Sequence, residues 1–277
     1  MTRIVGLLFS LGLIFLAIPQ IAKGQENIFD FKNSLIYAEH LSSKQEYKYA
    51  ALEYQRLLIL KPEDDSIRYH LIRSYRLAKQ WDLGIGFIED EYPEIKAVPN
   101  LVSQEYLKIL FHNEDFQRID GFLNHNSSLP VDYKSNMLVG RFLLAKDWTR
   151  AYSLSQNLQI YDPVLLSFAE QGKSIKRKSP VLASLLSVIL PGLGKVYSGD
   201  WKNGLVSFVY VGTAAFGAYR GFKVAGINSG FAWVFTGIGS AFYLSSIYGS
   251  HREAKGHNQR QEEILKNEVA SYLYSNF

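Results

Sequence analysis

Three groups of ionisable residues in this 277-residue chain have types that could act in catalysis or bind a metal. His251 and His257 are six residues apart, which places them on different faces of a helix, so they predict a solvated segment rather than a metal site. The segment FHNED (111–115) falls at an expected helix end and predicts a solvated turn. The segment EDD (63–65) precedes an expected helix start, where negative charge is favourable. The absence of cysteine excludes thiolate metal sites and a cysteine nucleophile. Because the other residues form no catalytic constellation either, we expect no enzyme active site, no metal and no cofactor.

Three basic residues, Arg73, Arg76 and Lys108, could hold a carboxylate through charge-assisted hydrogen bonds. They lie within an acidic part of the chain, because residues 25–172 contain 16 Lys and Arg against 21 Asp and Glu, a net charge of −5. Residues 173–277 contain 12 against 5, a net charge of +7. This opposite charge predicts two different environments for the two parts.

The elements that would position these residues are helices, because apolar residues between positions 31 and 165 recur at helical spacing. The sequence repeats in frames that start at Phe31, Asp65, Asn100 and Asp132, which are 34, 35 and 32 residues apart. Each frame predicts two antiparallel helices. Small residues recur within these frames, at Ala38, Ala50, Gly84 and Ala151.

This pattern resembles the tetratricopeptide repeat over residues 25–172. The resemblance implies an all-α solenoid in which the first helix of each pair lines a concave binding face. The residues that it places on or beside that face, facing a protein partner such as an acidic or C-terminal peptide, are Glu39, Tyr69, Arg73, Arg76, Lys108, Phe111 and His112. The alternatives are an unrelated helical bundle, and helix charges that are solvated and paired with their neighbours.

The first 24 residues are typical of a signal peptide, with Arg3, an apolar stretch at 4–18 and the small-x-small sequence Ala22-Lys23-Gly24. We expect cleavage after Gly24, and the alternative is an uncleaved anchor helix. Either one would place the following residues outside the cytoplasm.

A basic hinge at 173–179 precedes three apolar segments, which predict a membrane domain at 180–249 built as a small bundle of about three transmembrane helices. The segments are Pro180–Tyr197, Gly204–Tyr219 and Val224–Gly249. No acidic residue occurs from Trp201 to Arg252, as expected for segments in hydrocarbon. The basic pI therefore indicates membrane flanks, and we expect no nucleic-acid partner.

The stretch LPGLGKVYSGDWKNG (190–204) interrupts the first apolar segment. Proline removes a backbone donor and glycine permits the chain to reverse, so we expect a turn that neighbouring helices cover. The turn residues are Pro191, Gly192, Gly194, Tyr197, Gly199 and Gly204. Their pattern resembles the small bacterial membrane domain named for its two transmembrane helices, and related envelope proteins, and this resemblance implies residence in a membrane.

The tail, residues 250–277, places Ile264, Leu265, Val269, Tyr272 and Leu273 on one face of a helix. We expect an amphipathic helix that lies on the membrane or on the repeat domain. With three crossings the tail would lie in the cytoplasm, and basic residues near the membrane would then number six on each side. The positive-inside rule therefore does not choose between two and three crossings.

These observations predict a multi-pass protein of the bacterial inner membrane with its repeat domain in the periplasm. The expected function is that of a non-catalytic envelope adaptor that binds a protein partner. The alternative is a small transporter or channel accessory whose glycine-rich helices form a homo-oligomer; it is disfavoured because the apolar segments contain no acidic residue for an ion route.

Overall fold

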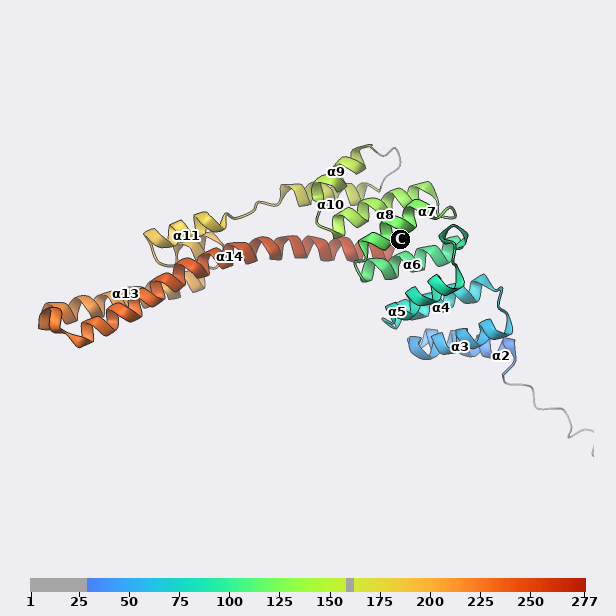
Figure 1. The fold of residues 1–277 in the computed structure, drawn as a ribbon, viewed down its shortest axis with the longest axis horizontal. Coiled ribbons are helices and arrows are strands. Elements are labelled where there is room, and N and C mark those ends of the chain that lie inside the picture. The colour runs from blue at the N-terminus through green and yellow to red at the C-terminus, as the bar shows by residue number, and fades with distance from the viewer. Residues whose placement is uncertain (1–28, 158–161) are drawn as a thin grey trace, which may run out of the picture. The chain divides into compact units, whose positions relative to one another are not determined.

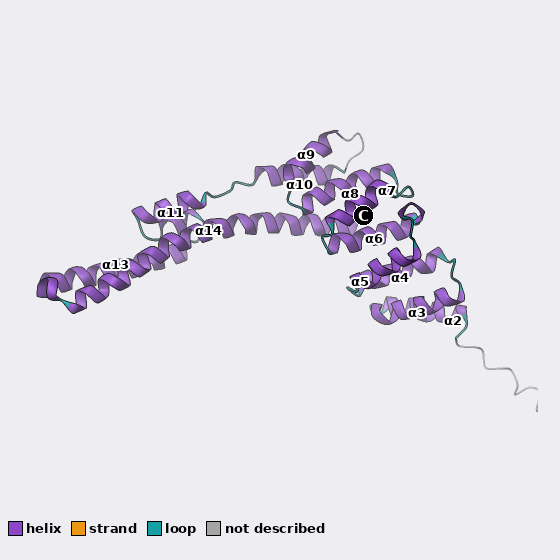
Figure 2. Cartoon of the chain, in the orientation of Figure 1, coloured by secondary structure: helices purple, strands orange, loops and turns teal. Residues whose placement is uncertain are grey.

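The computed structural model describes residues 29–157 and 162–277, and the predicted signal peptide (1–24) lies outside these ranges. The predicted all-α class is confirmed, because the described residues form thirteen α-helices and two short 3-10 helices and no strand (Figure 2). The chain divides into two compact units, one ending at Leu129 and the other beginning at Pro130.

The first unit consists of three helix pairs (Figure 1). Their bounds are α2 (Phe31–Ser43) and α3 (Tyr47–Leu60), α4 (Asp65–Leu77) and α5 (Trp81–Glu91), and α6 (Asn100–His112) and α7 (Phe116–His125), with a 3-10 helix, η2 (Ile95–Ala97), before α6. The helices α2, α4 and α6 begin at the first residues of the predicted frames. A fourth pair, α8 (Val131–Leu144) and α9 (Trp148–Asn157), opens the second unit one residue before the predicted start.

The loop inside each of these four pairs has the same backbone conformation. Each contains one non-glycine residue with positive φ: Gln45 (63°), Lys79 (57°), Glu114 (53°) and Lys146 (59°). In each loop the next residue donates its N–H to the carbonyl five positions earlier, as Gln80 does to Tyr75, a pattern that satisfies the last carbonyls of a helix. The period found in the sequence is therefore also the period of these loops.

Small residues allow the paired helices to pack closely, as the frames predict. Ala38, Ala50 and Ala151 have no exposed surface. A Cβ added at Gly84 of α5 would lie 3.2 Å from Ile72 Cδ1 of its pair partner α4, and 2.6 Å from Ile109 Cδ1 of α6 in the next pair. In the third pair the larger Ile119 occupies the small-residue position and is equally buried.

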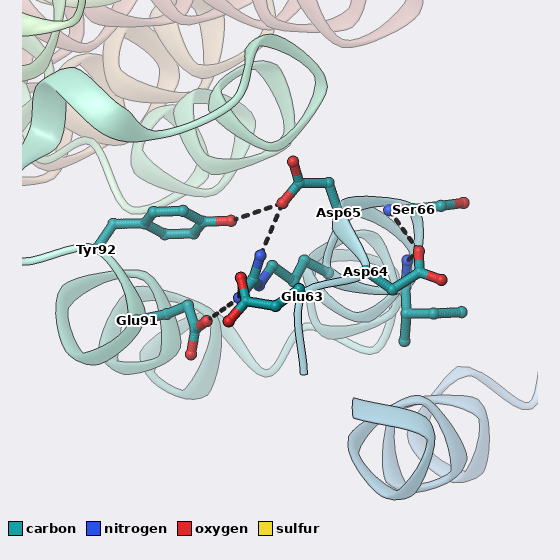
Figure 3. A network of polar contacts seen from close by, with 8 residues as sticks. Glu63, Asp64, Asp65, Ser66, Glu91 and Tyr92 are labelled. Carbon is teal, nitrogen blue, oxygen red and sulfur yellow. Dashed lines mark hydrogen bonds and ion pairs between the residues drawn. The ribbon is translucent and has the colours of Figure 1, made fainter. Parts of the chain in front are cut away.

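Arg68 connects the start of α4 to the end of α5 through ion pairs with Asp65 and Glu91, which are both labelled in Figure 3. Its guanidinium donates to Asp65 at 2.8 Å and to Glu91 at 2.5 Å, and lies 5.6 Å from the centre of the Tyr92 ring. Burial raises the pKa of Tyr92 to about 12. Asp64 accepts hydrogen bonds from the first backbone N–H groups of α4. The EDD segment therefore caps and anchors this helix pair, as its position before a helix predicts.

The second unit continues with α10 (Pro163–Ser174) and the apolar helices (Figure 1). These are α11 (Pro180–Ile189), α12 (Leu193–Tyr197), α13 (Trp201–Ala225) and α14 (Gly230–Asn276), with a 3-10 helix, η3 (Gly226–Asn228), between the last two. Among the described residues only α14 is long and apolar enough by length and mean hydropathy to cross a membrane. The first apolar segment of the sequence is split into two short helices, α11 and α12.

Helices α13 and α14 pack against each other as a hairpin. Small residues make the contact, because a Cβ added at Gly221 would lie 2.9 Å from Ala232 Cβ, and one at Gly239 would lie 3.2 Å from Ala214 Cβ. The outward faces of both helices are apolar and exposed. This arrangement leaves an apolar surface around a small-residue seam, as in paired membrane helices.

The tail does not form a separate helix but continues α14, and its end packs on α8 and α10. Leu265, Val269 and Leu273 of the predicted apolar face are buried, while Ile264 is exposed. Tyr272 donates a hydrogen bond to Asp162 at 2.6 Å. The sequence left open whether this apolar face packs on the membrane or on the helical domain. In the structure these residues pack on helices α8 and α10.

Because Lys79 has positive φ, we expect Lys79→Gly to stabilise the first unit. Glycine avoids the cost of about 1–2 kcal/mol that a non-glycine residue has in a left-handed conformation. Its more flexible unfolded chain lowers the free energy of unfolding by about 0.4–1 kcal/mol, so the net increase in that free energy should be about 0.5–1 kcal/mol. The midpoint of denaturant unfolding, followed by circular dichroism in detergent, measures it. Lys79→Ala, which keeps a Cβ, should show no gain, and a lower midpoint for the glycine variant would contradict this account.

Candidate functional site

The seven residues predicted to face a partner lie on the first helices of the three pairs in the first unit. Glu39 lies on α2, Tyr69, Arg73 and Arg76 lie on α4, and Lys108, Phe111 and His112 lie on α6. They do not form one continuous basic surface. The structure separates them into a pocket around Arg73 and a charge cluster around Glu105.

The pocket around Arg73, here called the Arg73 pocket, has a volume of about 260 Å³ and lies between α2, α3 and α4. Arg73 is exposed and makes no hydrogen bond or ion pair with any residue that the structure describes. Glu39 lines the same pocket and is likewise exposed and without an ion pair among the described residues. The Arg73 guanidinium is therefore available to a ligand.

Two aromatic side chains form part of the pocket wall beside Arg73. The rings of Tyr54 and His70 are stacked, with centroids 5.4 Å apart, and Tyr69 meets His70 edge-on at 5.1 Å. Burial, and next the positive charge of Arg73, lower the pKa of His70, so its imidazole is neutral at pH 7. Burial raises the pKa of Tyr54. The aromatic part of the wall is thus uncharged, and Glu39 is the carboxylate that lines the pocket together with Arg73, without an ion pair to it.

Arg76 and Lys108 are not free in the same way, because both bind the carboxylate of Glu105 on α6. Arg76 Nε lies 2.6 Å from Glu105 Oε2, and Lys108 Nζ lies 3.4 Å from Oε1. The Glu105 side chain is only 4% exposed. The alternative noted for the sequence, charges paired with their neighbours, therefore describes Arg76 and Lys108 and not Arg73.

The sequence reasoning missed Glu105. Its separation of three residues from Lys108 on one helix is a usable signal for an ion pair. Its pairing with Arg76 depends on how α4 and α6 pack, and the sequence of neither helix specifies this contact.

The remaining predicted residues are more buried than a binding face requires. Phe111 is 2% exposed and belongs to the core of the unit. The ring of His112 packs edge-on against Trp81 at 4.5 Å, and burial lowers the pKa of His112. Among the described residues no group of three or more His, Asp or Glu could hold a metal ion. Of the predicted residues in this unit, Arg73 is therefore the exposed cation without an ion pair among the described residues.

The predicted turn at 190–204 forms a second candidate site, in the second unit. Gly192 has φ +88° and Gly199 has φ +95°, and Gly192 precedes α12 directly. A Cβ at Gly192 would overlap with the carbonyl of Gly204, and one at Gly194 would overlap with the carbonyl of Ala183. Backbone thus touches backbone at three of the predicted glycines, where no other residue fits.

Serine hydroxyls from two helices satisfy the backbone of this turn. Ser246 of α14 accepts from Gly192 N at 2.8 Å, and Ser187 of α11 accepts from Gly194 N at 3.0 Å. Ser187 and Ser250 share a hydrogen bond of 2.7 Å, and all three serines are buried. The break that Pro191 introduces is therefore covered by protein, as we expected for a turn at membrane depth.

Tyr197 closes the other side of the turn. Its hydroxyl accepts from Ser179 N at 3.1 Å, and its ring lies 4.8 Å from Lys178 Nζ. Asn258 of α14 holds the same segment, just before α11, by two hydrogen bonds to the backbone of Lys178, at 2.7 and 2.9 Å. The turn residues thus fix α11 and α12 against α14.

We expect Gly194→Ala to disrupt the packing of α11, α12 and α14. The added methyl group would displace the backbone of α11, and overpacking of this kind costs about 1–3 kcal/mol or more. Gly212→Ala is the matched control, because a Cβ at Gly212 meets nothing within 4 Å. The yield of monodisperse protein and its thermal unfolding in detergent should fall for Gly194→Ala alone, and equal behaviour of both variants would show that the contact is not tight.

Comparison of the sequence with models of protein families, with curated proteins and with solved structures found no match. The function proposed for the chain is therefore based on the geometry of these two sites.

Proposed function

We propose that the chain is a non-catalytic, membrane-anchored adaptor whose helical pairs bind a protein partner through the carboxylate of an acidic or C-terminal peptide. The observation that carries this proposal is the Arg73 pocket, where an exposed guanidinium without an ion pair among the described residues lies beside an aromatic part of the wall. A guanidinium binds a carboxylate through two parallel hydrogen bonds. The repeated loops and helix pairs support a tetratricopeptide-like arrangement, in which first helices such as α2 and α4 face the ligand.

We expect Arg73→Ala to weaken binding of peptides with a free acidic C-terminus at least tenfold, about 1.4 kcal/mol. The helical content should stay the same, because exposed substitutions change stability by about 0.5 kcal/mol or less. Peptides selected on the full chain in detergent from a library with free C-termini serve as probes, and fluorescence anisotropy measures their affinity.

Lys48→Ala is the matched control, because Lys48 is an exposed cation on α3 with no described partner. Arg76→Ala is unsuitable as a control, because it would leave the buried Glu105 carboxylate without its main partner and so change stability as well as binding. Equal affinity of the Arg73→Ala protein and the original chain would contradict the proposal. Equal binding of amidated peptides would assign the bound carboxylate to an acidic side chain and not to the C-terminus.

We further propose that α14, the one described helix that is apolar and long enough by itself to cross a membrane, crosses together with α13, which is 25 residues long and packs along it. This hairpin gives two crossings in place of the three expected from the sequence. Helix α11 has ten residues, about 15 Å of helix, which is half of a hydrocarbon core of ~30 Å. The end of α14 contacts α8 and α10, which precede α11 in the chain. These contacts favour an arrangement in which both ends of the hairpin lie on one side of the membrane.

The export signal at the N-terminus supports a periplasmic location for that side. Only Arg220 and Lys223 would then lie near the membrane in the cytoplasm. The positive-inside rule disfavours such a distribution, but it applies to short loops, and long domains are translocated largely regardless of charge. The proposed localisation is therefore the bacterial inner membrane, with α8–α10 and the tail both outside the cytoplasm.

Reporters that are active only outside the cytoplasm test this topology when fused after residue 170 and after Phe277. We expect activity at both positions, because the two positions lie on the same side. A silent C-terminal fusion with an active fusion at 170 would support three crossings. Silence at both positions would retain the hairpin and contradict the export of this unit.

A further inference from the structure

A polar cleft of about 940 Å³ lies between α12, the start of α13 and the middle of α14. The ionisable residues that line it include four cations and two carboxylates, Lys195, Arg252, Lys255, Arg260, Asp200 and Glu253. The cleft, here called the interfacial cleft, therefore has an excess of two positive charges. The cleft shares no lining residue with the Arg73 pocket, and its excess charge has no role in the packing of the glycine turn.

The two carboxylates are already engaged within the chain. Glu253 accepts from Arg260 at 2.6 Å, and Asp200 accepts from the backbone and side chain of Asn203 at 3.2 and 2.6 Å. Arg252 and Lys255 are exposed and make no hydrogen bond or ion pair with the residues at 29–157 and 162–277. The excess positive charge is therefore located on these two side chains.

The cleft lies at one end of the apolar length of the hairpin. Uncharged residues of α14 extend from Gly230 to Ser250, and the polar part of the helix begins at His251. Tyr248 is 73% exposed, and Trp201 at the start of α13 is 59% exposed. Exposed Tyr and Trp at the ends of apolar helices mark the level of lipid headgroups.

Lys195 enters the same cleft from the turn. Its stem passes over Gly249, where an added Cβ would lie 3.2 Å from Lys195 Cε, and its ammonium donates to Ser207 at 2.9 Å. The positions of α12 and α14 thus bring a third cation, fixed by a hydrogen bond, next to the two without partners.

We propose that the interfacial cleft binds the phosphate of an anionic phospholipid headgroup, with Arg252 and Lys255 as its main ligands. Guanidinium and ammonium groups form strong charge-assisted bonds with phosphate oxygens, and basic pockets between membrane helices suit anionic headgroups. A zwitterionic headgroup adds its own cation and gains less from the excess charge. The inference rests on the membrane hairpin of the proposed function.

The test compares lipids on the purified full chain in a neutral detergent, by titration followed with native mass spectrometry. Phosphatidylglycerol is the probe, and phosphatidylcholine and inorganic phosphate are the comparisons. We expect the chain to bind phosphatidylglycerol at least tenfold more tightly than either one. The double variant R252Q/K255Q should lose at least tenfold in affinity for phosphatidylglycerol.

The matched control is R220Q/K223Q, which removes the same charge from two exposed residues at the other end of the hairpin. It should bind phosphatidylglycerol as the original chain does. Unchanged affinity of R252Q/K255Q, or an equal loss in the control, would overturn the proposal. Equal affinity for inorganic phosphate would show a free-anion site and overturn the lipid assignment.

Alkaline extraction of membranes separates this inference from the proposed function. If the chain is released from membranes without detergent, the hairpin itself is wrong. If it stays in the membrane and binds both lipids equally, only the interfacial cleft is wrong.

Discussion

The arrangement of the apolar helices depends on one contact, the approach of backbone to backbone at Gly192, Gly194 and Gly204. Buried N–H groups at such a contact must find acceptors, and two serine hydroxyls supply them. The serines come from α11 and α14, so the hydrogen bonds that satisfy the turn also hold these two helices together. The same turn positions Lys195 over Gly249 and fixes where α13 begins. Because Lys195 and the first residues of α13 line the interfacial cleft, the turn also shapes this cleft.

Helix α14 extends this constraint beyond the turn. Its 47 residues correspond to about 70 Å of continuous helix. The first part pairs with α13 and exposes apolar side chains, and the last part buries Leu265, Val269 and Leu273 against α8 and α10. Because the helix has no break between these two parts, the position and direction of one part fix those of the other. In the adaptor that we propose, this helix would link the last helical pair to the membrane without a flexible joint.

The sequence predicted those features that depend on local patterns. The starts of α2, α4 and α6, the small crossing residues and the turn at Gly192 follow from periodicity, side-chain size and glycine chemistry. It did not predict features that depend on contacts between distant segments. The pairing of Arg76 with Glu105, the burial of Phe111 and the packing of Val269 on a particular pair of helices require the packed structure. The polar residues at 251–262 suggested a separate tail because they lack apolar periodicity, yet the helix continues through them.

Net charge was informative at the scale of a unit and misleading at the scale of a site. In a part of the chain with net charge −5, two of three singled-out cations are paired with one buried carboxylate, and only Arg73 has no ion pair among the described residues. Charges farther apart than about 10 Å are largely screened at physiological salt, so a ligand responds to the few side chains that it touches. An acidic surface with a single unpaired guanidinium in a pocket would repel polyanions broadly and still bind one carboxylate that reaches the pocket. Selectivity of this kind comes from the absence of a partner for Arg73, which no count of charges reveals.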